Sequence, residues 1–366
     1  MHIWEMQSSS SLSGDSGIMD IEKEYNYNDA TSLTPNKTFK SKYHTSFLGR
    51  TKHKISNAFR NKSLGCLSLT LFVLGIIVCG TILTCNAFRG PKNSKIVIIL
   101  AVNDGGGVER WKTPEEWSVE RSSIANKKAY ADKHGYQLTL KDTKLKRRYS
   151  HEWREGWEKA DILKQTMREY PHAEWFWYLD LYTFIMEPEL KLEDYILKNI
   201  EKNAYRNVEH FNPLKIEVDS PYVNTKNEPV NLIVAQDCGG FNLGSFFIKR
   251  SPWSDLFLDA WWDPVLYEQM HMIWEHKEQD CLEVLYDYQP WIRERLAFVP
   301  LKAINAFPNG ACWEQRDDPR FFYNQNDRDF LVNMAGCNYG DRSCWGEYEH
   351  FKDLKEKLHR PWYKFW

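Results

Sequence analysis

The sequence carries almost no net charge. Its 48 Lys and Arg residues nearly balance 50 Asp and Glu residues, which leaves a formal charge of −2 over 366 residues. Without a domain-wide basic field, the chain lacks the electrostatic signature of proteins that bind nucleic acid. We therefore expect no nucleic-acid partner, and the partners have to be inferred from individual sites.

Long apolar runs are also absent, with one exception at residues 64–85. This run is uncharged over about twenty residues, the length of a helix that crosses a ~30 Å hydrocarbon layer. It exceeds the ~7–15 apolar residues of a cleaved signal peptide, which is the weaker alternative. Basic residues are denser before the run than after it: Arg50, Lys52, Lys54, Arg60 and Lys62 precede it, and Arg89 and Lys92 follow it. The positive-inside bias therefore predicts a cytosolic amino terminus and a single-pass type II membrane protein.

This run divides the chain into four predicted parts. Residues 1–63 are rich in Ser, Asn, Thr and Lys, and they bury too little apolar surface to fold alone, so we expect a disordered tail. Residues 64–85 form a transmembrane signal-anchor helix. Residues 86–94 are a short stem, and residues 95–366 form one lumenal domain.

The cysteines show no C-x2-C spacing and no accompanying histidine motif, so a zinc site is not expected. Five cysteines lie beyond the predicted anchor, namely Cys238, Cys281, Cys312, Cys337 and Cys344. In an oxidising compartment an odd number means that at least one is free or pairs between chains. Cys337 with Cys344 is the preferred bridge.

The strongest structural signal is the stretch EWFWYLDLYTFIMEP at residues 174–188. Its unbroken aromatic and apolar run ends at Asp180, a pattern typical of a strand that is buried on both faces. In open α/β sheets ligands bind beyond the carboxyl ends of the strands, where an unpaired buried charge is costly. We therefore expect Asp180 to face a metal or a cationic ligand. An N-cap or a salt-bridged aspartate is the alternative.

The segments before this stretch predict an α/β arrangement. The pattern indicates a strand at residues 95–101, a helix at residues 114–134 that ends at Gly135, and a second strand at residues 136–140. A strand, a loop, a helix and a strand in this order begin a βαβ unit.

The loop after the first predicted strand is rich in glycine. Residues 103–107 read Asn-Asp-Gly-Gly-Gly and match neither G-x-G-x-x-G nor a P-loop. Glycines let the backbone approach a ligand closely, so Asn103 and its neighbours are candidates for contact with a nucleotide. A plain flexible turn is the alternative.

Polar side chains in two further segments are candidates for the same cleft. Lys159 lies midway along a predicted helix at residues 151–170 and could reach a diphosphate, although most lysines on helices are solvated. Two predicted strands within residues 231–249 flank a loop that contains Asp237, three glycines, Asn242 and Ser245. That composition suits close polar contact with a ligand rich in hydroxyl groups.

A later helix begins with acidic residues. The segment HKEQD precedes an apolar pattern through Tyr286 and contains Glu278, Gln279 and Asp280. Carboxylates in a first turn interact favourably with the helix dipole, which is sufficient reason for their presence. At a helix terminus that faces the cleft, the same three side chains are candidates to contact a sugar or a developing cation.

Taken together, these stretches resemble glycosyltransferase family 34, and most closely its fungal Golgi α-1,6-mannosyltransferase subunits. The resemblance rests on EWFWYLDLYTFIMEP, GGFNLGSFFIK, HKEQD and VNMAGCN, with support from NKKAYADKHGY and YSHEWREGWEKADILKQTMREYP upstream. It covers roughly residues 95–366. It implies a GT-A fold with a Rossmann-like mixed sheet, a nucleotide-sugar donor, a divalent metal and retention of the donor's anomeric configuration.

The resemblance also implies a metal-binding set in which two ligands are altered. The family's D-x-D motif falls on Asp180 and Tyr182, so the second acid is replaced by tyrosine. A metal-binding histidine near the carboxy terminus of plant members matches Asn333. Carboxylate oxygens are the usual ligands for Mg²⁺ or Mn²⁺ at such sites, and Mn²⁺ is the expected metal.

The remaining carried-over roles concern donor and sugar contacts. Lys159 matches a lysine that contacts the donor diphosphate, and Asn242 and Gly244 lie in the G-x-N-x-G loop beside Ser245. Glu278 and Gln279, with Asp280 next to them, match the acidic helix start near the reacting sugar.

The implied activity is hexosyl transfer of mannose from GDP-mannose to the α-1,6-mannan backbone of N-glycans. The enzyme would act in the Golgi lumen as one subunit of a mannan polymerase complex with other mannosyltransferases, anchored by residues 64–85. The alternative is a non-catalytic subunit that binds glycan or partner chains through the same fold.

The predicted topology can be tested by protease protection. Protease added to sealed Golgi vesicles should remove only about the first sixty residues, because the bilayer shields everything beyond the anchor. Immunoblots with tags at each terminus check the result. Digestion of the carboxy-terminal tag with survival of the amino-terminal tag would mean the opposite orientation.

Overall fold

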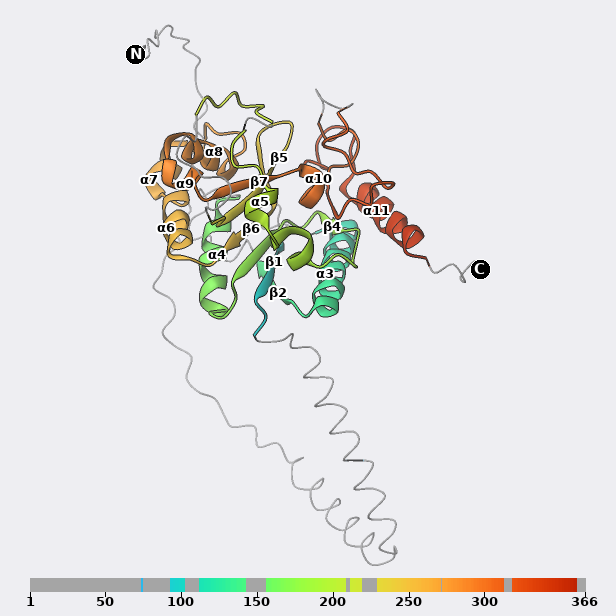
Figure 1. Cartoon of the computed structure of the whole chain (residues 1–366). Coiled ribbons are helices and arrows are strands. Elements are labelled where there is room, and N and C mark those ends of the chain that lie inside the picture. The colour runs from blue at the N-terminus through green and yellow to red at the C-terminus, as the bar shows by residue number, and fades with distance from the viewer. Residues whose placement is uncertain are drawn as a thin grey trace, which may run out of the picture. The chain divides into compact units, whose positions relative to one another are not determined.

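A computed structural model of the chain describes residues 93–102, 112–142, 156–208, 211–218, 229–270, 272–312 and 318–360, together with Leu74. The chain separates into two units, residues 1–79 and 80–366, and the fold below belongs to the second unit (Figure 1). Within the described ranges, no helix has the length and apolar character to cross a membrane. The predicted tail, the anchor apart from Leu74, and Asn103 with its glycine run lie outside the described residues.

A six-stranded mixed sheet forms the centre of the domain, with strand order β2-β1-β3-β6-β5-β7. Its strands are β1 (Ile96–Val102), β2 (Gln137–Asp142), β3 (Trp175–Leu179), β5 (Leu232–Gln236), β6 (Phe241–Lys249) and β7 (Leu296–Val299). Strand β6 runs antiparallel to both of its neighbours, and the other pairs are parallel. A second sheet pairs β4 (Thr183–Ile185) with β8 (Leu331–Asn333). The expected α/β class with a mixed sheet is confirmed.

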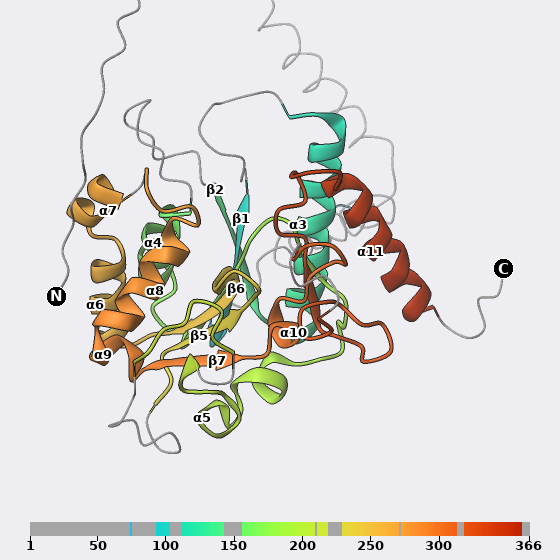
Figure 2. The ribbon, with the colours of Figure 1, turned by 90° about the horizontal axis from the view of Figure 1, so that it is seen from above.

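Helices cover both faces of the large sheet (Figure 2). The helices are α3 (Pro114–His134), α4 (Glu158–Glu169), α5 (Ile200–Asn203), α6 (Pro252–Trp261), α7 (Pro264–Met270), α8 (Glu278–Tyr288), α9 (Pro290–Arg293), α10 (Leu301–Ile304) and α11 (Cys344–Leu358), with a π-helical turn η1 (Glu193–Leu197). Helices α4, α6 and α8 lie on one face, and α3, α10 and α11 lie on the other. The result is a helix–sheet–helix sandwich.

Strand β3 is buried on both faces, as its unbroken apolar sequence predicts. Phe176 and Tyr178 pack into the cluster under α4, α6 and α8. Trp177 packs into the opposite cluster, where its ring stacks on Phe247 at 5.2 Å and on Phe330 at 5.6 Å. Each large apolar side chain buried there stabilises the fold by about 2 kcal/mol. The strand is therefore a rigid support for whatever follows its last residue.

Helix α3 begins and ends where the sequence predicts. Thr113 caps the amino terminus, its hydroxyl accepts from the Glu116 amide, and Pro114 occupies the first turn. Gly135 ends the helix in the left-handed conformation with φ of 73°, which glycine adopts without steric cost. These are local signals, so they can be recognised without knowledge of the tertiary structure.

Two disulfides form among the five cysteines that lie beyond the predicted anchor. Cys337 pairs with Cys344, as predicted, and Cys238 pairs with Cys312 across 74 residues. Cys281 is free and buried in α8. The expectation of at least one unpaired cysteine is met by Cys281, because burial keeps this thiol inside the core.

Candidate active site

Strand β6 bulges where it passes the end of β3. Ile233 of β5 lies opposite Phe247, whereas Ala235 lies opposite Asn242, so two steps along β5 span five steps along β6. The sequence predicted a loop from Asp237 to Ser245, but the strand already begins at Phe241. The correction has a physical reason, because pairing with β3 keeps the bulged segment in the sheet. Bulges of this kind often re-aim side chains at active sites.

The backbone groups at the bulge are hydrogen-bonded to residues that the sequence marked as functional. The four bonds are Lys159 Nζ to Leu243 O at 3.0 Å, Leu243 N to Gln279 Oε1 at 2.8 Å, Asp180 N to Gly244 O at 2.8 Å, and Gly244 N to Asn242 Oδ1 at 3.0 Å. Buried backbone groups that leave a sheet ladder need such partners. Several predicted ligand contacts therefore also hold the strand in shape.

Lys159 lies between two carboxylates. Its Nζ is 2.8 Å from Glu278 Oε1 and 3.5 Å from Asp180 Oδ1, and the Tyr178 ring lies 5.3 Å away on the same side. The side chains of Lys159 and Glu278 are each 8% exposed, whereas that of Asp180 is 24% exposed. Two carboxylates and one ammonium leave one formal negative charge. The cluster therefore favours a cationic ligand, and Asp180 is its accessible member.

Two glycines make room for the functional side chains. A Cβ at Gly156 would lie 1.7 Å from Glu278 Oε2, and the φ of 82° at Gly156 also favours glycine. A Cβ at Gly244 would lie 2.3 Å from Asn333 Nδ2. The Glu278 carboxylate and the Asn333 amide thus each pack directly over a glycine backbone.

Two of the predicted metal ligands lie at strand ends: Asp180 follows β3, and Asn333 ends β8. Asn333 is buried at the end of β8, and its neighbour across the ladder is Thr183. Asn333 packs on Gly244, whose carbonyl accepts from the Asp180 amide, so both residues converge on one glycine. Tyr182 is only partly buried and packs against the cluster beneath α11. The structure therefore brings Asp180 and Asn333 to one place and gives Tyr182 an additional packing role.

Two of the predicted contacts have a structural role instead. Ser245 is fully buried and accepts a hydrogen bond of 2.9 Å from the Trp177 indole, so it is not accessible to a cofactor. Asp280 accepts from the His276 amide at 2.9 Å and lies 3.5 Å from its imidazole. The hydrogen bond to Asp280 raises the pKa of His276 to about 9. Asp280 therefore fixes the start of α8, and the prediction of a catalytic role gains no support.

Sequence reasoning missed Glu283, which continues the contact between α8 and β6. Gln279 accepts from the Leu243 amide, and Glu283 accepts from the Phe241 amide at 2.7 Å. Four residues of helix rise about 6 Å, and two residues of strand rise about 6.6 Å, so the two spacings match. The separation of four residues between Gln279 and Glu283 was the available signal.

The turn between β5 and β6 is closed by a polar network. Asp237 accepts from the amides of Gly239 and Gly240 at 2.7 and 3.1 Å, and from Asn242 Nδ2 at 2.6 Å. Burial raises the pKa of Asp237 despite these hydrogen bonds. Asn305, which the sequence did not single out, donates to Asn242 Oδ1. Asn242 is thus oriented by three partners, and it shapes the bulge through its bond to the Gly244 amide.

The side chains that the structure describes could hold a metal ion only together with oxygens from a bound ligand. No three acidic, histidine or cysteine side chains come together as a metal site in the part of the chain that the structure describes. Asp180 offers one carboxylate, and Mg²⁺ is commonly held by one or two carboxylates plus substrate phosphates and water. The donor set is therefore suited to a cation that arrives with a diphosphate.

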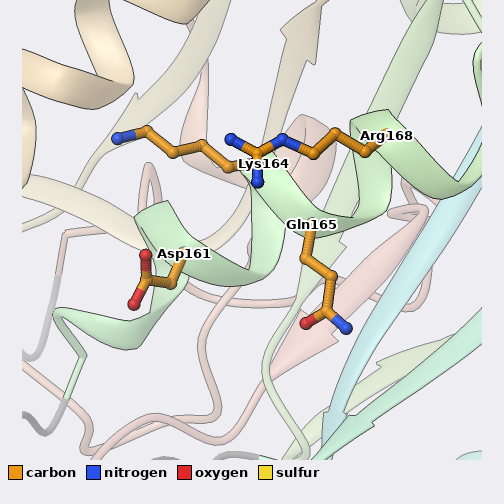
Figure 3. A pocket seen from close by; sticks show the side chains of 4 residues that line it. All are labelled: Asp161, Lys164, Gln165 and Arg168. Atoms are coloured by element: carbon orange, nitrogen blue, oxygen red, sulfur yellow. The ribbon is translucent and has the colours of Figure 1, made fainter.

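A separate hollow lies along the exposed side of α4 (Figure 3). Its volume is about 510 Å³, and its described lining consists of Asp161, Lys164, Gln165 and Arg168. All four side chains come from the side of α4 opposite the core, whereas Lys159 points inward to Glu278. This hollow is therefore distinct from the candidate active site.

The class of the protein follows from comparison with known sequences. Residues 92–345 match the profile of the galactosyl transferase GMA12/MNN10 family, which is glycosyltransferase family 34. The chain belongs to this family and is a glycosyltransferase.

Two yeast relatives share most of the chain. It is 60% identical over 272 residues to the probable α-1,6-mannosyltransferase MNN10 of Saccharomyces cerevisiae, covering 74% of this chain and 69% of that protein. It is 47% identical over 299 residues to an uncharacterized α-1,2-galactosyltransferase of Schizosaccharomyces pombe, covering 81% and 85%. Among solved structures, a glycosyltransferase involved in glycosylation of the major capsid of PBCV-1 aligns with a TM-score of 0.45 and 15% identity, over 71% of this chain and 100% of that one.

Glu283 predicts a pH dependence of stability. Burial raises its pKa from about 4.5 to about 7, so the folded chain holds this proton more tightly than the unfolded chain. The associated stability is present below pH 4.5 and is lost as the pH rises through 7. At 1.36 kcal/mol per pKa unit, the free energy of unfolding of the wild type should fall by up to about 3 kcal/mol over this pH range. Glu283→Gln should abolish this fall.

Thermal or denaturant unfolding between pH 4.5 and 7.5 measures the effect. The matched control is Glu356→Gln, an exposed glutamate on α11. Parallel stability profiles for wild type and Glu283→Gln would contradict the assignment.

Proposed function

We propose that the protein is a retaining α-1,6-mannosyltransferase of GT-A type that uses GDP-mannose and extends the α-1,6-mannan backbone of N-glycans. The observation that carries this proposal is the 60% identity to a probable α-1,6-mannosyltransferase over 74% of the chain. The proposal includes a Golgi location as a type II membrane protein and a place in a complex with other mannosyltransferase subunits. The purified full-length chain, incubated with GDP-mannose, Mn²⁺ and a short α-1,6-mannoside, should form a longer mannoside.

The donor diphosphate would bind beside Asp180, the accessible carboxylate of the cluster. When bound, a divalent cation such as Mn²⁺ would offset the negative charge that builds on the departing nucleoside diphosphate. Asp180 would hold that cation, and Asn333, which packs on the glycine that is bonded to Asp180, is the nearest of the other predicted ligands on the same backbone. Tyr182 supplies no carboxylate, so the phosphate oxygens of the donor would have to supply more of the ligands to that cation.

Lys159 and Glu278 would act on different parts of the donor, the diphosphate and the sugar. The Lys159 ammonium attracts both carboxylates and keeps Glu278 in place, with a separation of 2.8 Å. When a diphosphate enters, the same ammonium is positioned to donate to its oxygens. Glu278 would then stabilise the positive charge that develops on the sugar ring, which is the usual task of a carboxylate near an anomeric carbon.

A second candidate function is that of a non-catalytic subunit. It is favoured by Tyr182 and Asn333, which stand where the family resemblance implies an acid and a histidine. In this role the same fold would bind glycan or neighbouring subunits while another chain supplies the chemistry. Metal-dependent binding of the donor distinguishes the two candidates.

Asp180→Asn should reduce the turnover number at least about 100-fold, because it removes the charge that holds the cation while it preserves the shape of the side chain. The fold should stay intact, since the hydrogen bond to Gly244 uses the Asp180 amide. Initial rates of mannose transfer and the melting temperature provide the measurement.

The control for this variant is Asp259→Asn, which alters an exposed aspartate that pairs with Lys164 on the outside of α4. Wild-type rates in Asp180→Asn would remove Asp180 from the proposed mechanism.

Tyr182→Asp should strengthen metal-dependent binding of GDP-mannose if phosphate oxygens compensate for a missing carboxylate. A second hard oxygen ligand raises the affinity for Mg²⁺ or Mn²⁺. Calorimetry with and without Mn²⁺ measures the change, and Tyr182→Asn is the uncharged control.

Weaker binding in Tyr182→Asp than in Tyr182→Asn would indicate repulsion from Asp180 at a site that is already complete. If neither wild type nor variant binds the donor in a metal-dependent manner, the enzyme proposal fails and the non-catalytic subunit remains.

A further inference from the structure

Strand β4, which follows Asp180, has different partners on its two edges. On one edge β8 supplies the partners, since Met334 N donates to Tyr182 O at 3.1 Å and Met186 N donates to Phe330 O at 2.9 Å. The alternate residues Leu181, Thr183 and Ile185 direct their backbone groups to the other edge, as the alternation of an antiparallel strand requires. No strand is paired with that other edge among the described residues.

Side chains of α3 take the place of a neighbouring strand on that edge. Ser123 Oγ donates to Leu181 O at 2.7 Å, and Lys127 Nζ donates to Thr183 O. Asn126 makes two bonds to Ile185, from its Nδ2 to the carbonyl at 3.0 Å and from the amide to its Oδ1 at 2.9 Å. Three side chains within a stretch of five residues of one helix thus bond to the backbone of three alternate residues, and Lys355 of α11 adds a bond to Ile185 O at 2.8 Å.

The three side chains of α3 are buried to an extent that is unusual for polar residues. Ser123 and Lys127 are completely buried, and Asn126 is 8% exposed. Lys127 also donates to Ser123 Oγ at 2.8 Å, and no carboxylate is bonded to its ammonium nitrogen within the described chain. A buried lysine without an acidic partner is costly, and its burial lowers its pKa well below the usual range, with Lys355 adding to the effect. In this structure the cost of burying Lys127 is offset by the hydrogen bonds that it donates to Thr183 O at the edge of β4 and to Ser123 Oγ.

The held segment leads directly back to Asp180. Thr183 Oγ1 donates to the Asp180 carbonyl at 2.7 Å, and Thr183 N lies 3.3 Å from the same oxygen. Thr183 is therefore bonded to Asp180 on one side and to Lys127 on the other. Any shift of Thr183 along the strand edge displaces the turn that carries Asp180 and Tyr182.

We propose that Ser123, Asn126 and Lys127 are positioning residues for the metal and donor end of the active site. They fix the backbone from Leu181 to Ile185 and thereby the direction of the Asp180 carboxylate. This inference rests on the proposed function, since it is the donor and its cation that Asp180 would hold. It also gives a role to the stretch NKKAYADKHGY, which begins at Asn126.

Lys127→Met tests the inference, because methionine fills a similar volume without a donor. The variant leaves Thr183 O unsatisfied, and a misplacement of about 1 Å at a reacting centre costs about 100-fold in rate. We expect at least a 10-fold weaker affinity for GDP in the presence of Mn²⁺ and a similar loss in kcat/KM for transfer. The matched control is Lys128→Met, the next residue of α3, whose exposed side chain pairs with Asp132.

Calorimetry of Mn²⁺ and GDP at a temperature well below both melting temperatures gives a readout that does not depend on turnover. The inference is overturned if Lys127→Met and Lys128→Met bind GDP with equal affinity and Lys127→Met differs only in a lower melting temperature. Lys127 would then contribute to stability alone. If Lys127→Met does not fold, Ser123→Ala takes its place under the same criteria. This variant removes the bond to Leu181 O and the acceptor for Lys127 Nζ, and it leaves the bond from Lys127 to Thr183 O available.

The same experiment separates this inference from the proposed function. If wild type binds GDP with Mn²⁺ but transfers no mannose, the transferase proposal fails and the ratio of GDP affinities still decides the positioning role. If wild type shows no Mn²⁺-dependent GDP binding at all, the positioning inference is overturned as well, since there is then no cation site to position.

Discussion

The bulge of β6 is the constraint on which the rest of the candidate site depends. A strand that leaves its regular ladder exposes backbone groups, and in a buried sheet each of them requires a partner. Here the partners come from α4, α8, the end of β3 and the strand itself. Because these four elements meet at two consecutive residues, Leu243 and Gly244, the bulge fixes their relative positions more strictly than helix packing alone would.

The charged side chains at this framework are few, and they pair with one another. Lys159 is almost buried; it donates to Leu243 O, and its ammonium lies within 3.5 Å of the carboxylates of Glu278 and Asp180. Removing one partner of a buried ion pair strongly destabilises a fold, so replacement of Lys159 or Glu278 alone should lower the stability of the domain. At the same time the 3.5 Å contact to Asp180 is the longest and most exposed of the three, and it is the contact that an entering ligand can replace at the lowest cost.

Local signals explain which parts of the fold the sequence predicts well. The limits of α3 follow from Thr113, Pro114 and Gly135, and the burial of β3 follows from its continuous apolar run. The bulge, the role of Glu283 and the pairing of Cys238 with Cys312 depend on segments that meet only after folding. The same limit applies to Ser245, because a serine in a glycine-rich stretch looks the same in sequence whether it faces a ligand or a buried indole.

The two-sided support of β4 has a consequence for how this family can diversify. The backbone of the strand is bonded to β8 on one edge and to side chains of α3 on the other, and its own side chains are buried in the core. Tyr182, which precedes the strand, is only partly buried. A position whose backbone is held by its neighbours can carry an acidic or an aromatic side chain without displacing the turn, so the chemistry at this position can change while the strand beside it keeps its place.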